Sequence, residues 1–189
     1  MKPVDRVGEI WKEHLGVTQA LVGIAPDVAR AAELIAGAFD RGGRLFLAGN
    51  GGSAADAQHI AAELTGRFLR DRRPLPAVAL HMNTSALTAV GNDFGFEQVF
   101  ARELSAHGRA GDVLVALSTS GDSANILRAI DVARELGMQV IGLTGTSGGR
   151  MLAACDLCLR VPSAHTPRIQ EMHILIGHTL CELIEERLC

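Results

Sequence analysis

Apolar residues along the chain follow two spacings, and from about residue 44 onward these spacings alternate. Apolar positions three and four apart predict helices, whereas short continuous apolar runs predict buried strands. The predicted helices cover about 4–21, 26–42, 53–68, 123–136 and 168–188, with a further helical region broken around 91–93. The predicted strands cover 44–48, 76–80, 112–117, 139–144 and 157–161.

The predicted strands are apolar almost throughout, which is typical of strands buried on both faces. Strands separated by helices predict a parallel sheet with helices on both sides. We therefore expect an α/β fold, a three-layer α-β-α sandwich around a five-stranded parallel sheet. No linker or internal repeat divides the chain, so one domain is expected over 1–189, with two leading helices in about 1–42. Ligands of such sheets bind beyond the carboxyl ends of the strands.

Composition narrows the functional classes. The chain has 189 residues, 21% of them charged, and a net charge of −3 without any lysine or arginine run, so nucleic-acid binding has no electrostatic support. The first 15 residues mix charged with apolar side chains, unlike a signal peptide, and no apolar run reaches membrane-spanning length. We expect a cytoplasmic protein without a membrane partner, and its four cysteines suit a reducing compartment.

Cys155 and Cys158 form a C-x-x-C pair. In a strand, residues three apart face opposite sides. We therefore expect two ordinary buried residues here rather than a redox or metal-binding pair.

Hydroxyl residues follow the strand at 112–117 as Ser118-Thr119-Ser120-Gly121, directly ahead of a helix that starts near Ser123. Hydroxyl groups, a glycine and a helix N-terminus together suit a bound phosphate. No lysine is present, so this is not a Walker nucleotide loop. The alternative is a serine that only caps the helix. The glycine-rich segment 49–53 at the equivalent strand–helix turn is either a tight turn or the second wall of the same pocket.

His59 and Glu63 lie four residues apart on the helix after the glycine-rich segment, so both project from one face. Their neighbours are mostly small or apolar. Partial desolvation would favour the protonated carboxyl group and suit Glu63 to general-base chemistry. The alternative is an ordinary pair on the helix surface that contributes little to the stability of the helix.

Gln170, His173 and His178 lie on the last predicted helix. Gln170 and His178 are about 80° apart around its axis, so both can line one broad face, whereas His173 is less well aligned. His59, Glu63, Gln170 and His178 form a possible divalent-metal set, although glutamine is an uncommon zinc ligand. The alternative for each histidine is an ordinary interior or surface residue.

Several segments occur together in the order typical of one family. They are Gly49-Asn50-Gly51-Gly52-Ser53-Ala54-Ala55-Asp56-Ala57-Gln58-His59, Ala62-Glu63-Leu64-Thr65-Gly66-Arg67-Phe68, Val90-Gly91-Asn92-Asp93-Phe94-Gly95, Leu117-Ser118-Thr119-Ser120-Gly121 and Arg168-Ile169-Gln170-Glu171-Met172-His173. With these motifs the chain resembles the bacterial phosphoheptose isomerases of the SIS (sugar isomerase) superfamily over nearly its whole length. The resemblance implies interconversion of sedoheptulose 7-phosphate and D-glycero-D-manno-heptose 7-phosphate, for bacterial surface glycans.

The resemblance also implies roles for individual residues. Glu63 and His178 would be the acid/base pair, and a zinc ion would be held by His59, Glu63, Gln170 and His178. The substrate would contact Asn50, Gly51, Gly52, Ser53, Glu63, Asn92, Asp93, Ser118, Thr119, Ser120, Ser123 and Gln170. The family implies a homotetramer with shared active sites, a role that suits the leading helices.

One position departs from the pattern of some family members, because Pro167 stands where they have an acidic residue; Asp93 is a possible substitute.

Three alternatives to a phosphoheptose isomerase remain. A non-catalytic, replication-initiator-associating branch shares several motifs but lacks the equivalents of Glu63 and His178. The scaffold also serves other phosphosugar isomerases. A sugar-phosphate-sensing regulator would need a DNA-binding module, for which no residues remain.

Overall fold

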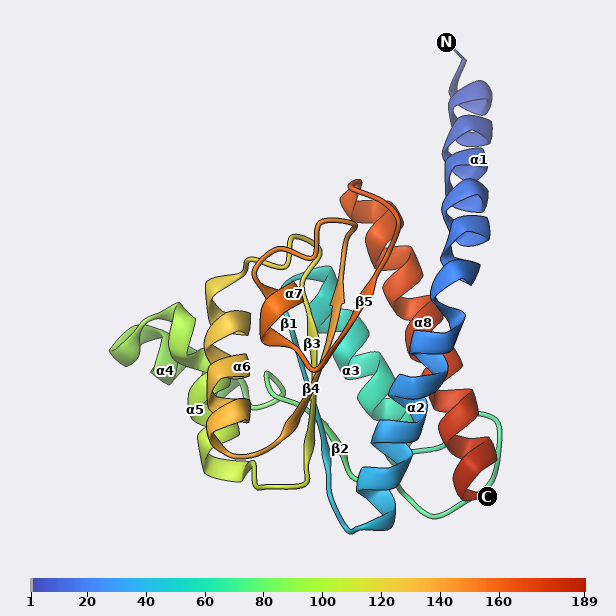
Figure 1. Cartoon of the computed structure of the whole chain (residues 1–189). Coiled ribbons are helices and arrows are strands. Elements are labelled where there is room, and N and C mark those ends of the chain that lie inside the picture. The colour runs from blue at the N-terminus through green and yellow to red at the C-terminus, as the bar shows by residue number, and fades with distance from the viewer. Residues whose placement is uncertain (1) are drawn as a thin grey trace.

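Five apolar segments form one parallel sheet in the computed structural model, which describes residues 2–189 (Figure 1). The strands are β1 (Leu45–Gly49), β2 (Ala77–Ala79), β3 (Val113–Leu117), β4 (Gln139–Thr144) and β5 (Leu157–Arg160). Their order in the sheet is β2-β1-β3-β4-β5, so the chain turns back at the β1–β3 boundary. The predicted fold class is confirmed. The predicted domain range also includes Met1, which lies outside the described residues.

Helices cover both faces of this sheet. One face carries α2 (Ala25–Asp40), α3 (Gly52–Thr65) and α8 (Thr166–Leu188), and the other carries α5 (Val99–His107) and α6 (Ala124–Glu135). The shorter elements are η1 (Val22–Ile24), α4 (Thr84–Phe94), η2 (Phe96–Gln98) and α7 (Met151–Ala154). Among residues 2–189, no helix combines the length and apolarity needed to cross a membrane.

Strand β1 shows why the strand pattern is apolar at every position. Leu45 and Leu47 pack in the core beneath α2, α3 and α8, whereas Phe46 and Ala48 pack beneath α5 and α6. All five residues of the strand are buried. Alternate side chains of a strand face opposite sides, so a sheet with helices on both faces needs apolar residues at consecutive positions.

Two predicted helix boundaries were wrong. The expected break at Gly91-Asn92-Asp93 lies inside α4, which instead ends at Phe94 because Gly95 adopts a φ of +89°. The helix expected to reach residue 68 ends at Thr65, and an irregular segment follows before β2.

The expectation that Cys155 and Cys158 face opposite sides was also wrong. Cys155 caps the short helix α7 and precedes β5, so strand alternation does not apply to it. Both sulfur atoms lie beside Gly142, where an added Cβ would be 2.8 Å from the Cys155 Sγ and 3.5 Å from the Cys158 Sγ. Burial raises the pKa of the Cys155 thiol to about 12, which keeps it protonated and unreactive at neutral pH.

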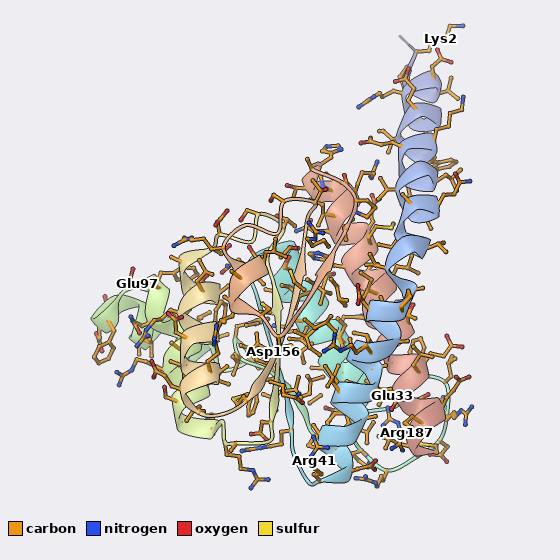
Figure 2. The ribbon with its side chains drawn as sticks, viewed as in Figure 1. Lys2, Glu33, Arg41, Glu97, Asp156 and Arg187 are labelled. Carbon is orange, nitrogen blue, oxygen red and sulfur yellow. The ribbon has the colours of Figure 1, made fainter. Side chains whose placement is uncertain are left out.

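The first helix, α1 (Pro3–Leu21), begins one residue before its predicted start and extends beyond the rest of the molecule (Figure 1). Its apolar side chains Val4, Val7, Trp11 and Leu15 are exposed. The following helix α2 packs along α8, and Figure 2 shows Glu33 beside Arg187, whose charged atoms are 3.5 Å apart. The segment formed by α1 and α2 is therefore attached to the sandwich through α2, and the start of α1 projects away from it.

Acid should destabilise the fold through His173, whose side chain is fully buried on α8. Burial lowers the pKa of His173 from 6.5 to about 4, against a weak opposing contact with the Thr144 carbonyl oxygen. The unfolded state therefore binds the extra proton first as the pH falls below about 6.5, and the folded state loses ~3 kcal/mol by pH 4. Denaturant unfolding measured between pH 7 and pH 4 should show this slope. His173→Gln, which keeps a donor but cannot titrate, should remove that part of it; an unchanged slope would contradict the assignment.

Candidate active site

Three side chains from α3 and α8 converge on one point. The His59 Nε2 lies 2.9 Å from the His178 Nε2 and 3.2 Å from the Glu63 Oε1. One ligand atom of each residue lies within 4.8 Å of the other two. His59 and Glu63 therefore do more than form a local pair on the helix surface, because a residue more than a hundred positions away joins them.

Gly177 explains how the two helices come close enough for this contact. A Cβ at Gly177 would lie 2.5 Å from the Ile60 Cδ1 and 2.7 Å from its Cγ1, so a larger residue there would displace the Ile60 side chain that packs between the helices. Ile60 and Gly177 are the residues next to His59 and His178. The small residue thus sets the approach of the two imidazoles, and the sequence-based analysis did not identify it.

The donor set fits a tetrahedral zinc ion. Two imidazole nitrogens and a carboxylate oxygen are common zinc ligands, and at bond lengths of about 2.0–2.1 Å neighbouring donors lie ~3.3 Å apart. The two measured separations, 2.9 and 3.2 Å, are close to that value. Half of the His59 side-chain surface is exposed, so a further ligand could reach this group from solvent. A metal would also displace the proton that the His59–His178 hydrogen bond requires.

Gln170 lies apart from this group within one chain. Its side-chain amide packs against Gly52, where an added Cβ would be 2.6 Å from the Gln170 Nε2. Gln170 and His178 both face α3, as their spacing predicted, but they are about two helical turns, or ~12 Å, apart along α8. Gln170 therefore contacts the start of α3, next to the glycine-rich segment, rather than the three converging side chains.

Asp56 is a second residue near the site that the sequence-based analysis missed. It lies one turn before His59 on α3, and its Oδ2 is buried without a hydrogen-bond partner. Burial raises the pKa of Asp56 to about 6, with His59 partly opposing the shift. A carboxyl group with this property beside a candidate metal ligand is typical of functional sites. No sequence pattern separates it from the other polar residues of the helix.

The hydroxyl loop after β3 has a defined internal geometry. The Ser118 hydroxyl lies 3.0 Å from the Ser123 hydroxyl and accepts a hydrogen bond from the Gly121 N–H at 3.2 Å. Ser120 accepts from the Asp122 N–H at 3.1 Å. Neither serine satisfies a donor inside α6, which begins at Ala124 and has no side-chain cap. The hydroxyls therefore form a cluster beside the helix N-terminus rather than an ordinary helix cap.

Asn50 joins the glycine-rich segment to α6. Its side-chain amide exchanges two hydrogen bonds with that of Asn125, at 2.9 and 2.8 Å. Asn125 is buried, and its position on the inner face of α6 is the signal that could have identified it. This pair fixes the two loops against each other at the β1–β3 boundary, where ligands of such sheets bind.

A pocket of about 330 Å³ adjoins the hydroxyl loop on the side of β4 and β5. Thr119 and Ser120 form part of its wall, and Thr146, Ser147 and Thr166 add further hydroxyl groups. No single sequence motif marks this second set of hydroxyl residues, because they follow two other strands.

Asn92 and Asp93 are separated from the histidine–glutamate group within one chain. They lie in α4, none of whose residues is buried, and their side chains bond to each other at 2.7 Å. Figure 1 shows α4 beyond α5 and α6, on the opposite side of the sheet from α3 and α8. Pro167 lies exposed in the first turn of α8.

Gly121→Ala should damage the hydroxyl loop. Gly121 has a φ of +73°, and an added Cβ would lie 2.1 Å from the Gly148 carbonyl oxygen. The strain costs about 1–3 kcal/mol, and the loop must shift, which we expect to raise KM for a phosphorylated substrate at least about tenfold. Gly137→Ala is the control, because Gly137 has a φ of +72° but only ordinary contacts. Equal KM values for the two variants would contradict a role of the loop in binding.

Comparisons with known proteins agree with this architecture. The SIS domain family matches residues 17–145. A phosphoheptose isomerase of Rhodospirillum rubrum is 62% identical over 165 residues, which are 87% of this chain and 88% of the relative. Phosphoheptose isomerase 1 of Campylobacter jejuni is 50% identical over 97% of this chain and 98% of its own. The solved structure of a phosphoheptose isomerase from Neisseria gonorrhoeae is 46% identical, with a TM-score of 0.93 over 98% of this chain and 100% of the other.

The fold and the two strand–helix loops thus define a sugar isomerase (SIS) domain, and the chain belongs to that family. Within the family it is an aldose–ketose isomerase of the phosphoheptose isomerase group.

Proposed function

We propose that this chain interconverts sedoheptulose 7-phosphate and D-glycero-D-manno-heptose 7-phosphate by proton transfer through an enediol, with Glu63 and His178 as the acid/base pair. The observation that carries the proposal is the convergence of Glu63 with His59 and His178 on one point. The substrate phosphate would bind the hydroxyls of Ser118, Thr119, Ser120 and Ser123. Further substrate contacts would come from Asn50, Gly51, Gly52, Ser53, Asn92, Asp93 and Gln170.

The distance between the glycine-rich segment and the converging side chains suits such a substrate. Gly52 begins α3 and His59 lies seven residues further, about 10 Å along the helix axis. An extended seven-carbon sugar phosphate spans a comparable length. The phosphate held at the strand ends would therefore leave the carbonyl end near Glu63 and His178.

Glu63 would remove the proton from C1 of the ketose, giving a cis-enediol, and would return it to C2. A carboxylate can do both, because one oxygen can accept the proton from one carbon and release it to the next. Its side chain is one-quarter exposed, so water has limited access to it. His178 would pass a proton to and from the substrate oxygens through the ring nitrogen that does not bind the metal, since imidazole acts as both acid and base.

A zinc ion would be held by His59, Glu63 and His178, with Gln170 as the possible fourth ligand. When bound, it would supply Lewis-acid polarisation of the substrate carbonyl oxygen. The position of Gln170 within one chain gives a direct test of its role. Gln170→Ala should weaken zinc binding if the residue is a ligand, and should only raise KM if it contacts the substrate.

A second copy of this chain would complete the site, in a homotetramer with shared active sites. Two features support this proposal. Asn92 and Asp93 are far from Glu63 within one chain, so they can contact the same substrate only from another copy. The exposed apolar face of α1 also continues into an apolar groove of about 340 Å³ between α1, α2 and α8, lined by Leu21, Val22, Val28, Leu175 and Ile176. A charge on this face should weaken the contact between copies, so Trp11→Glu should have a lower mass in solution than the wild type.

The decisive experiment is an assay with pure sedoheptulose 7-phosphate, followed by NMR detection of the aldose product. Arabinose and hexulose phosphates are the comparison substrates, because the SIS scaffold serves several phosphosugars. Faster turnover of either comparison substrate would reassign the specificity, and binding without turnover would favour the non-catalytic alternative.

We propose the cytoplasm as the location, supported by the four free cysteines and a phosphorylated substrate.

A further inference from the structure

The segment between α3 and β2 contributes an aromatic ring to the candidate active site. Phe68 stacks on the imidazole of His178, with ring centroids 5.4 Å apart and an interplanar angle of 25°. On its edge, the imidazole contacts His59 through the Nε2–Nε2 approach, and a ligand atom of Glu63 lies within 4.8 Å of it. Phe68 thus covers one face of the ring whose edge points to His59 and Glu63.

A buried carboxylate holds the backbone of this segment. The Glu185 carboxylate accepts hydrogen bonds from the N–H groups of Phe68, Leu69 and Arg70, each at 2.9 Å. Its side chain is only 1% exposed. Burial opposes its ionisation, but the three N–H donors and Arg72 outweigh burial and lower the pKa of Glu185. Residues 68–70 are therefore held through their backbone N–H groups.

Arg72 completes the anchor and connects it to α3. Its guanidinium lies 3.0 Å from the Glu185 carboxylate, and its side chain is 3% exposed. It also donates hydrogen bonds to the carbonyl oxygens of Glu63 and Leu64, at 2.9 and 2.7 Å. These carbonyls belong to the last turn of α3, which has no partners of its own for them. Arg72 thus fixes the backbone directly at Glu63.

The anchor and the site share both helices. Glu185 lies on α8 seven residues after His178, about two turns along, and Arg72 caps the helix that carries Glu63. A stacked aromatic ring restricts rotation of an imidazole, and such orienting partners typically change metal affinity or activity 10–100-fold. The same anchor therefore fixes the Glu63 backbone and one face of His178.

We propose that Phe68, held by Glu185 and Arg72, is a positioning residue that orients the His178 imidazole toward His59 and Glu63. The proposal deepens the function proposed above and rests on it, because it assigns Phe68 to the same proton-transfer and metal-binding group.

Phe68→Leu is the main test, because leucine keeps an apolar side chain and leaves the backbone hydrogen bonds intact. We expect kcat to fall about tenfold or more, KM to remain unchanged, and the dissociation constant for Co²⁺ to rise about tenfold or more. Phe68→Tyr should restore all three values because it keeps the stacked ring. Leu69→Ala is the matched control, since Leu69 lies in the same segment, is exposed and uses only its backbone with Glu185.

A readout that needs neither turnover nor metal separates this proposal from the proposed function. The rate at which diethyl pyrocarbonate modifies His178, followed by mass spectrometry, should rise in Phe68→Leu but not in Leu69→Ala. If the wild type fails to isomerise the heptose phosphate, the proposed function fails while this rate still tests the orientation. Phe68→Leu with wild-type kcat, Co²⁺ affinity and modification rate would overturn the positioning role.

Glu185→Gln tests the anchor itself. One of the amide's two ends donates rather than accepts, so at least one of the three N–H groups loses its partner. If the variant folds, it should show the same direction of change as Phe68→Leu, with a lower unfolding midpoint. A destabilised variant with an unaltered His178 modification rate would mean that Glu185 supports the fold but not the ring.

Discussion

Glu63→Gln should lower kcat about 10²- to 10⁴-fold, the usual contribution of a positioned general base. Glutamine has nearly the same shape as glutamate, and its amide oxygen can still approach the His59 Nε2. What it loses is the ability to accept a proton from carbon. KM should change little, because the proposed phosphate contacts lie at the strand ends, where α3 begins about 10 Å along its axis from His59.

Deuterium exchange isolates this step from binding. In D₂O the wild type should incorporate solvent deuterium at the substrate carbon next to the carbonyl, and Glu63→Gln should not. Glu186→Gln, an exposed carboxylate near the end of α8, is the matched control and should behave as the wild type. Near wild-type turnover, or undiminished exchange, in Glu63→Gln would exclude Glu63 as the base. The metal content of each variant must be measured in parallel, because Glu63 is also a proposed ligand.

Removal of the proposed zinc ion should have the second large effect. Chelation should reduce turnover about a hundredfold or more, since polarisation of a carbonyl by a metal ion contributes several kcal/mol at the transition state and each 1.36 kcal/mol is tenfold in rate. It should also lower the unfolding temperature, because a ligand at about 1,000 times its dissociation constant stabilises the folded state by ~4 kcal/mol. Addition of zinc should restore both properties.

One ligand variant and one control variant make this test specific. His59→Ala should abolish stoichiometric zinc binding and the response to chelation, because it removes the nitrogen that lies 2.9 Å from the His178 Nε2 and 3.2 Å from the Glu63 Oε1. His107→Ala removes an exposed histidine on α5 and should leave zinc binding unchanged. Protein that is metal-free as purified, fully active and indifferent to zinc would refute the metal site while leaving the acid/base pair to be tested separately.

The order and type of the main elements could be predicted from the sequence because the relevant signals are local. Continuous apolar runs such as 113–117 need burial on both faces, which only a sheet between two helical layers provides. The short helix α7 and the end of α4 escaped prediction. A four-residue helix carries too little periodicity, and glycine at 91 is tolerated inside a helix when its neighbours support it.

The hydroxyl loop shows how far local chemistry extends. Its serine residues, the glycine with positive φ and the following helix are neighbours in the sequence. They must therefore lie close together in the folded protein. The pairing of His59 with Glu63 is also local, because four residues make about one helical turn. Family resemblance added His178 to this pair, but spacing alone could not place it there.

By itself, the sequence determined the α/β class, the strand–helix loops and the face of α3 that carries His59 and Glu63, because each depends on residues within a few positions of one another. Only the tertiary structure decided that His178 meets this face, that Gln170 contacts Gly52 instead, and that Glu185 holds Phe68 over the imidazole. These contacts join residues more than a hundred positions apart. They depend on the close approach of α3 and α8 at Gly177, which follows from packing of the whole core and from no local pattern.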